Sequence, residues 1–270
     1  MFTYSILPSK KSRMSDTQLA LLLTLLAGIS TGLGAIPILF KENYSTRFRH
    51  IALGFSAGVM ICASFISLII PGIEAGSSLN LPYQAGSLLV IAGLLLGHII
   101  ISYTHDRLPH EHVYKKDDYK GKTKFSSAIM ILVAMTLHNF PEGLAVGVGF
   151  GGEDMSAGIV IALAITLQNL PEGLIIALSL VTSGVHKKKA FFISFLSGMV
   201  EPIGAALGFL VTQISTLMLP TALGLAAGAM IFVVSHELIP EVHKEGYERE
   251  ATHGLIFGIV LILLLDTSFA

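Results

Sequence analysis

The sequence predicts an all-α membrane protein with eight transmembrane helices. Its 270 residues are 53% hydrophobic and only 13% charged, and their mean hydropathy is +0.74. A soluble globular domain carries roughly twice that share of charged residues. The apolar residues also gather into long runs, each near the length of about 20 residues that a helix needs to cross a hydrocarbon core. The lipid bilayer is therefore the expected surrounding of most of the chain.

Eight apolar runs define the expected helices. They lie at roughly 17–40, 49–72, 83–104, 125–149, 156–182, 189–212, 217–240 and 252–269, each close to the span length that a bilayer requires. Residues 1–16 form an N-terminal tail, and residues 17–270 form one transmembrane domain. The longest connection, at about 105–124, carries several histidines.

The positive charges predict how the domain is oriented. Lysine and arginine occur in the first, third, fifth and seventh connections, whereas the second, fourth and sixth have none. Connections rich in these residues stay in the cytoplasm. Both termini should therefore face outward or into the periplasm.

The chain repeats itself at an offset of 170 residues. The segment LGFSAGVMI at Leu53–Ile61 reappears as LGLAAGAMI at Leu223–Ile231. A glycine pair in the first span, at positions 28 and 34, recurs in the sixth span at 198 and 204. Span two runs outward and span seven inward, so the repeat is inverted, with spans 1–3 related to spans 6–8 and spans 4 and 5 paired. Inverted repeats are typical of transporters with a site near the membrane midplane.

Spans four and five each contain a copy of one polar motif. The copies are LHNFPEGL at Leu137–Leu144 and LQNLPEGL at Leu167–Leu174. His138 and Glu142 are four residues apart and share one helix face, and a proline between them frees a backbone carbonyl. The second copy has Gln168 in place of the histidine. Because spans four and five are antiparallel neighbours, their motifs can face each other.

Span six adds a third carboxylate, Glu201, beside Pro202. A charged side chain at the centre of a membrane helix costs roughly 2.5 to 3.5 kcal/mol on insertion scales, and like charges in one site oppose each other's ionisation. No lysine or arginine lies at that depth, so protons or a cation must balance the charge. Imidazole, carboxylate and amide donors without thiolates suit a divalent first-row metal, zinc especially.

These residues resemble the signature of the ZIP family of divalent metal transporters, in particular its bacterial GufA-like branch. The resemblance rests on HNFPEG in span four, QNLPEG in span five and VEP in span six, and covers the chain from about Thr17. It implies a ZIP-like transporter in the bacterial inner membrane, a homodimer and an elevator-like movement of spans one, four, five and six. It also implies a main metal site and a second, adjacent site that shares the glutamates. The implied ligands of the main site are His138, Glu142, Gln168, Glu172 and Glu201, and those added by the second site are Asn139 and Asn169.

Other polar residues suggest a path to and from this site. His236 and Glu237, near the cytoplasmic end of span seven, are expected on an exit path, although interfacial capping explains them about as well. Glu74 and Asp266, near the outer ends of spans two and eight, are candidates for the entrance. A cluster in the third connection either senses cytoplasmic metal or is simply part of a hydrated loop; it comprises His105, Asp106, His110, Glu111 and His112.

The sequence therefore favours a carrier that imports Zn²⁺, with related ions as further candidates, rather than an enzyme. Gln168 in place of a second histidine weakens the preference for zinc, so Cd²⁺, Fe²⁺ or Mn²⁺ can be further substrates. No catalytic cofactor is expected, and the near-neutral charge gives no support to nucleic-acid binding. Two alternatives remain open: a proton-coupled carrier of an organic solute, and an intramembrane metalloprotease based on HELIP at residues 236–240. The protease motif lacks its second histidine, since Pro240 stands there.

Overall fold

The computed structural model describes residues 16–41, 43–79, 83–107, 124–152, 155–215, 217–243 and 246–269. Within these ranges the regular elements are all helices, and eight of them are long and apolar enough to cross a membrane. The predicted fold class is confirmed. Nearly all of the N-terminal tail and residues 108–123 of the third connection, including His110, Glu111 and His112, lie outside the described residues.

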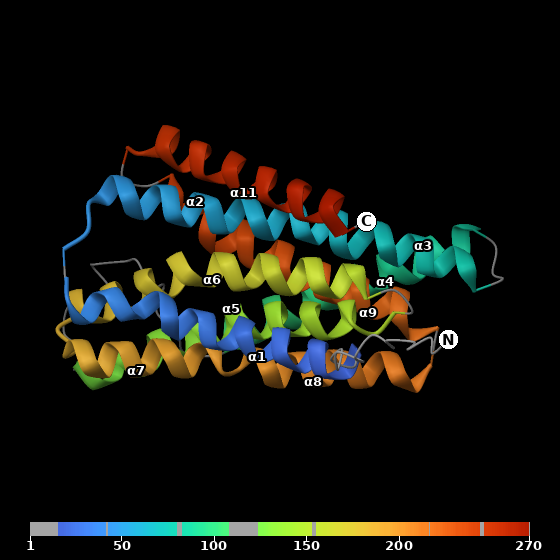
Figure 1. Ribbon diagram of the computed structural model, residues 1–270, viewed down its shortest axis with the longest axis horizontal. Coiled ribbons are helices and arrows are strands. Elements are labelled where there is room, and N and C mark those ends of the chain that lie inside the picture. The colour runs from blue at the N-terminus through green and yellow to red at the C-terminus, as the bar shows by residue number, and fades with distance from the viewer. Residues whose placement is uncertain are drawn as a thin grey trace, which may run out of the picture.

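The eight spans are built from eleven numbered α-helices. Their bounds are α1 (Asp16–Ala35), α2 (Thr46–Ala63), α3 (Ile70–Ser78), α4 (Tyr83–Arg107), α5 (Lys124–Gly149), α6 (Ser156–Thr182), α7 (Lys187–Gly198), α8 (Glu201–Ile214), α9 (Met218–Val233), α10 (Ile239–Val242) and α11 (Glu248–Phe269). A 3₁₀ turn, η1 (Ile36–Leu39), extends the first span. Figure 1 shows the long helices running side by side along the longest axis of the molecule.

Two spans change helix type part-way along. The second passes from α2 through a π-helical segment, η2 (Ser64–Ile69), into α3 and reaches Ser78, well past the expected end at 72. The seventh passes from α9 through a second π-helical segment, η4 (Val234–Leu238), into α10. Such π segments are frequent at functional sites, and η4 contains both residues that the sequence assigns to an exit path.

The sixth span is interrupted, which the hydropathy pattern does not reveal. It runs from Lys187 to Ile214 but divides between α7 and α8 at residues 199–200. Pro202 has no N–H, so the carbonyl of Gly198 loses its helical partner four residues on. Glu201 consequently lies in the first turn of α8, where the helix dipole favours a negative charge.

Four helix pairs make the most extensive contacts: α2 with α11, α4 with α9, α1 with α6, and α5 with α8. In the first two pairs, glycines four residues apart on both helices allow the backbones to meet. A methyl group on any of them would run into the backbone of the facing helix; they are Gly54 and Gly58 of α2, Gly254 and Gly258 of α11, Gly93 and Gly97 of α4, and Gly224 and Gly228 of α9. Small residues at such crossings are how membrane helices pack closely without a hydrophobic driving force.

The other two pairs use glycine to hold the motif helices. A methyl group at Gly173 of α6 would meet the carbonyl oxygen of Thr31 on α1. A methyl group at Gly143 of α5 would likewise meet the carbonyl oxygen of Glu201 on α8. The PEG glycines thus bring α1 and α8 directly against the two polar motifs.

Candidate metal site

The polar motifs of α5 and α6 face each other in the interior, as the sequence predicts. Gln168 donates a hydrogen bond from Nε2 to Oε1 of Glu142 at 2.5 Å. His138 Nε2 lies 3.6 Å from Glu172 Oε1 and 4.0 Å from Glu142 Oε1. Both helices continue through their prolines, Pro141 and Pro171. Each motif therefore contributes to one shared cluster.

Three of these side chains are arranged as metal ligands would be. His138, Glu142 and Glu172 each offer one ligand atom, and the three atoms lie within 4.8 Å of one another. All three residues are at most 2% exposed. Ligand atoms around a tetrahedral zinc lie about 3.3 Å apart, because each bond is about 2.0–2.2 Å long. The three atoms would have to move closer together to share one such ion.

A second group of polar residues adjoins the first. Asn169 accepts a hydrogen bond from Gln168 Nε2 at 3.3 Å and donates from Nδ2 to Glu201 Oε1 at 2.8 Å. Asn139 is fully buried beside His138 in the sequence. The resemblance places Glu201 in the main site, whereas its hydrogen bonds join it to Asn169 and Thr31. Glu201 therefore hydrogen-bonds one of the two amides that the resemblance assigns to the second site.

The cluster also contains many polar atoms without a hydrogen-bond partner. Among the described residues, most buried side-chain nitrogen and oxygen atoms without a hydrogen-bond partner lie here. They are His138 Nδ1 and Nε2, Asn139 Nδ2 and Oδ1, Glu142 Oε2, Gln168 Oε1, both carboxylate oxygens of Glu172, and Glu201 Oε2. Burying a polar atom without a partner is costly, and native proteins keep such atoms where they serve a function. A divalent cation would satisfy the oxygens and an imidazole nitrogen together.

One end of the cluster continues toward the third connection through Glu237. Its carboxylate lies 3.7 Å from His138 Nδ1 on one side and 3.6 Å from His105 Nε2 on the other. The ring of His236 packs edge-on against that of His105, with centroids 4.7 Å apart. His105 belongs to the last turn of α4 and is 8% exposed, so it is not part of a hydrated loop. Its neighbour Asp106 is exposed.

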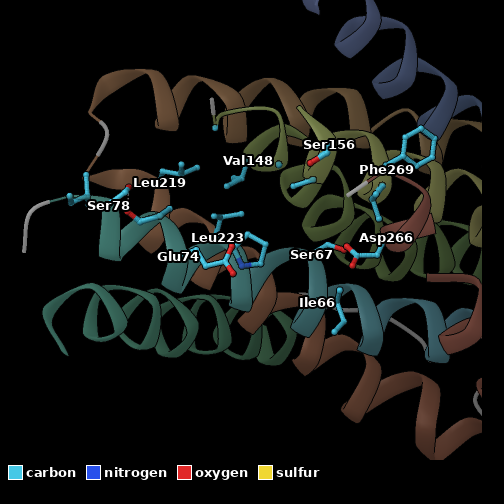
Figure 2. Close-up of a pocket in the computed structure, with 17 residues that line it drawn as sticks. Ile66, Ser67, Glu74, Ser78, Val148, Ser156, Leu219, Leu223, Asp266 and Phe269 are labelled. Atoms are coloured by element: carbon cyan, nitrogen blue, oxygen red, sulfur yellow. Dashed lines mark hydrogen bonds between the residues drawn. The ribbon is translucent and has the colours of Figure 1, made fainter. Parts of the chain in front are cut away.

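The two candidates for the entrance line a cavity at the opposite end of the molecule. Glu74 of α3 and Asp266 of α11 both border this cavity of about 810 Å³, which Figure 2 shows. Its other lining is largely apolar and comes mainly from α3, α5, α6, α9 and α11. None of the seven predicted ligand residues lines it. The cavity and the polar cluster are therefore separate spaces in this structure.

Two residues that contact the cluster are not predicted from the sequence. Thr31 of α1 donates to Glu201 Oε1 at 3.3 Å, and His105, which the sequence places in the third connection, lies 3.6 Å from Glu237. The 170-residue repeat offered a signal for Thr31, because the glycines that define the offset lie three residues on either side of it, and Glu201 stands at the equivalent place. His105 offered none, because its contact with η4 depends on where α4 ends.

Comparison with known proteins agrees with this geometry. A family model described as "ZIP Zinc transporter" matches residues 103–266. The zinc transporter GufA of Myxococcus xanthus is 46% identical over 92% of this chain and 98% of its own. The zinc transporter ZIPB of Bordetella bronchiseptica is 39% identical over 88% of this chain and 77% of its own, and the zinc transporter ZupT of Clostridium perfringens is 36% identical over 92% and 95%.

The chain belongs to the ZIP family. It is thus an integral, multi-pass membrane transporter rather than an enzyme, which decides against the metalloprotease alternative. Metal transport also explains the buried histidine and glutamate cluster better than transport of an organic solute does. The candidate ligand atoms converge on one point, as they would around an ion, and do not line a cavity.

Proposed function

We propose that this ZIP protein carries Zn²⁺ into the cytoplasm through the buried cluster of α5, α6 and α8. Similarity to relatives named zinc transporters supports zinc as the substrate. The observation that carries the proposal is the set of buried, unpartnered ligand atoms that converge between the two motifs. The proposed ligands are His138, Asn139, Glu142, Gln168, Asn169, Glu172 and Glu201.

The donor set supports two adjacent ion positions. His138 and Gln168 contact the glutamates of the two motifs, whereas Asn169 contacts Glu201 and links it to Gln168. Glu142 and Glu172 would then be shared by both ions. Since carboxylate and amide oxygens outnumber imidazole nitrogens, harder or larger ions such as Mn²⁺, Fe²⁺ and Cd²⁺ are proposed as further substrates.

The same cluster suggests how ions enter and leave. Glu237 contacts His138 and His105 and leads toward the end of α4, so it is proposed as the first carboxylate on the exit path, with His236 beside it. Glu74 and Asp266 would attract cations into the outer cavity. Replacing both with neutral amides should raise the KM for zinc and leave the maximal rate unchanged; an unchanged KM would refute this role.

Alternating access is proposed to follow the inverted repeat. Its support is that related spans make equivalent contacts. Gly54 of α2 lies against the carbonyl oxygen of Ala251 on α11, and Gly224 of α9 lies against that of Val90 on α4. Gly54 and Gly224 are 170 residues apart in the sequence, and Val90 and Ala251 are 161 residues apart. Helices α1, α5, α6, α7 and α8 would move together against the remaining helices. The protein is further proposed to form a homodimer, with both termini outside the cytoplasm; a monomer mass in native mass spectrometry would contradict the dimer.

Uptake of radioactive zinc into proteoliposomes tests the main proposal. Glu142→Gln and Glu172→Gln keep the side-chain shape but remove the negative charge that both ion positions need. Each should abolish zinc uptake. Glu250→Gln is the matched control, because Glu250 pairs with Arg47 at 3.3 Å far along the chain from the motifs, and it should transport like the parent. Parent-like uptake by both site variants would overturn the assignment.

A further inference from the structure

One hydroxyl group donates a hydrogen bond to Glu201, the carboxylate of the proposed second ion position. Thr31 of α1 is 1% exposed, and its Oγ1 donates to Glu201 Oε1 at 3.3 Å. Asn169 Nδ2 donates to the same oxygen at 2.8 Å. Oε1 therefore holds two donors, whereas Oε2 of the same carboxylate is buried with none. This division leaves one oxygen of Glu201 for an ion and occupies the other.

Thr31 has little freedom to be anywhere else. Its carbonyl oxygen lies against the Cα of Gly173, where a methyl group would collide with it. A methyl group on Gly198 would lie 2.7 Å from Thr31 Cβ and 2.8 Å from its Oγ1. The backbone of α6 thus fixes the main chain of Thr31, and the end of α7 limits its side-chain rotation. A hydroxyl held in this way is pre-organised for its acceptor.

The amide of Asn169 is fixed by the same helix. Its Nδ2 donates to the carbonyl oxygen of Ala27 at 3.0 Å as well as to Glu201. With both protons of the amide engaged, Oδ1 must point the other way, where it accepts from Gln168. Helix α1 therefore orients two ligands of the second ion position without offering a charged group of its own.

We propose that Thr31 is a positioning residue that holds Glu201 so that Oε2 faces the second ion. The inference rests on the proposed metal site and deepens it. Without the hydroxyl, Asn169 alone would hold Oε1, and the carboxylate could rotate or bind the ion through either oxygen. Partners that orient a ligand in this way commonly contribute 10- to 100-fold to metal affinity, by order of magnitude. The ion held by His138, Glu142 and Glu172 should feel much less of this loss.

The test uses the purified full-length protein in detergent and in liposomes. Thr31→Val replaces the hydroxyl by a methyl of similar size, Thr31→Ala removes it without adding bulk, and Thr31→Ser retains it. Thr212→Val is the matched control: Thr212 is a buried threonine of α8 whose hydroxyl donates to Phe209 in its own helix. Calorimetric titration with Zn²⁺ gives the stoichiometry and both affinities, and uptake gives KM and maximal rate.

The expected result is selective weakening of the second ion. Thr31→Val and Thr31→Ala should bind it about 10-fold or more weakly, bind the first ion like the parent, and show a raised KM. Thr31→Ser and Thr212→Val should stay within about 3-fold of the parent, on the scale of an ordinary surface change. The inference is overturned if Thr31→Val or Thr31→Ala binds the second ion as tightly as the parent does. It is also overturned if Thr31→Ser binds the second ion as weakly as Thr31→Val does.

Glu201→Gln separates this inference from the proposed function. If Glu201→Gln also binds both ions like the parent, the proposed second ion position is wrong. If Glu201→Gln loses the second ion and the Thr31 variants retain it, only the role of Thr31 is wrong. First-ion affinity serves as the check of folding in every variant, because His138, Glu142 and Glu172 bind only when α5 and α6 are packed together.

Discussion

Helices α1, α5, α6 and α8 form two halves that pack alike but contribute different polar side chains to the buried cluster. In one half α5 meets α8, and in the other α6 meets α1. Gly143 lies against the carbonyl of Glu201 just as Gly173 lies against the carbonyl of Thr31. The first half contributes His138 and Glu201, whereas the second has Gln168 and Thr31 at the equivalent places. Both differences remove a strong ligand from the same half.

This comparison separates what the fold requires from what the substrate requires. The glycines are needed twice, because each motif helix must approach a neighbouring backbone in the same way. The histidine and the third carboxylate occur only once, because the two halves share one buried cluster of polar side chains. Glu142 and Glu172 differ from these residues, because both motifs have a carboxylate at this position. Each could bind the ion that is proposed to lie between the motifs. Equivalent substitutions in the two halves should therefore have equal effects on folding and unequal effects on zinc.

The largest expected effect is the loss of the fold when either PEG glycine becomes alanine. In Gly143→Ala and Gly173→Ala the new methyl group would collide with a backbone carbonyl, and a backbone cannot rotate away as a side chain can. Overpacking of this kind costs about 3 kcal/mol or more. Size-exclusion profiles and thermal unfolding of the detergent-solubilised protein should show both variants as severely destabilised, and to a similar degree.

Gly72→Ala is the control for that comparison. A methyl group at Gly72 would lie 3.1 Å from Cγ2 of Val90 and 3.3 Å from Cβ of Leu223, and these separations need a shift of only a few tenths of an ångström. Gly72→Ala should therefore purify as a folded protein. If only one of the two PEG variants were destabilised, the equivalence of the two halves would be wrong.

A smaller loss, of zinc affinity, is expected when the motif with His138 is made like the motif with Gln168. His138→Gln gives both motifs the sequence QNxPEG and removes the imidazole that lies nearest Glu142 and Glu172 among the described residues. Losing one zinc bond of about 3 kcal/mol corresponds to ~100-fold weaker binding. Zinc titration of the purified variant measures the affinity. His98→Gln is the matched control, because His98 packs against Phe232 away from the motifs. Parent-like zinc affinity in His138→Gln would exclude the imidazole as a ligand.

The helices and the first group of ligands could be predicted from sequence because both depend on local patterns. Span lengths follow from the hydrocarbon thickness, and His138 and Glu142 share a face because of helical periodicity. Two copies of one motif on antiparallel neighbours then determine that Gln168 and Glu172 face them. The 170-residue offset additionally relates Thr31 to Glu201, but a buried threonine alone carries no signal of a ligand.

The remaining features depend on contacts between helices that no local pattern encodes. Pro202 stands at the division of the sixth span, yet prolines at 141 and 171 leave their helices continuous. A proline in an apolar span therefore does not by itself predict whether the helix divides. The burial of His105 against Glu237 likewise depends on tertiary packing. Hydropathy cannot distinguish these cases, because every span is apolar.

The smallest expected effect is a change in metal selectivity when the motif with Gln168 is made like the motif with His138. Gln168→His places a second imidazole opposite His138, where Gln168 now binds Glu142 at 2.5 Å. Imidazole favours zinc over manganese, for which oxygen ligands are better suited. The ratio of zinc to manganese uptake should rise about 10-fold, which corresponds to ~1.4 kcal/mol. Competition of radioactive zinc uptake by manganese measures this ratio, with Gln213→His on the exposed side of α8 as the control. An unchanged ratio would mean that Gln168 does not touch the ion, and that the difference between the two motifs has no part in choosing the metal.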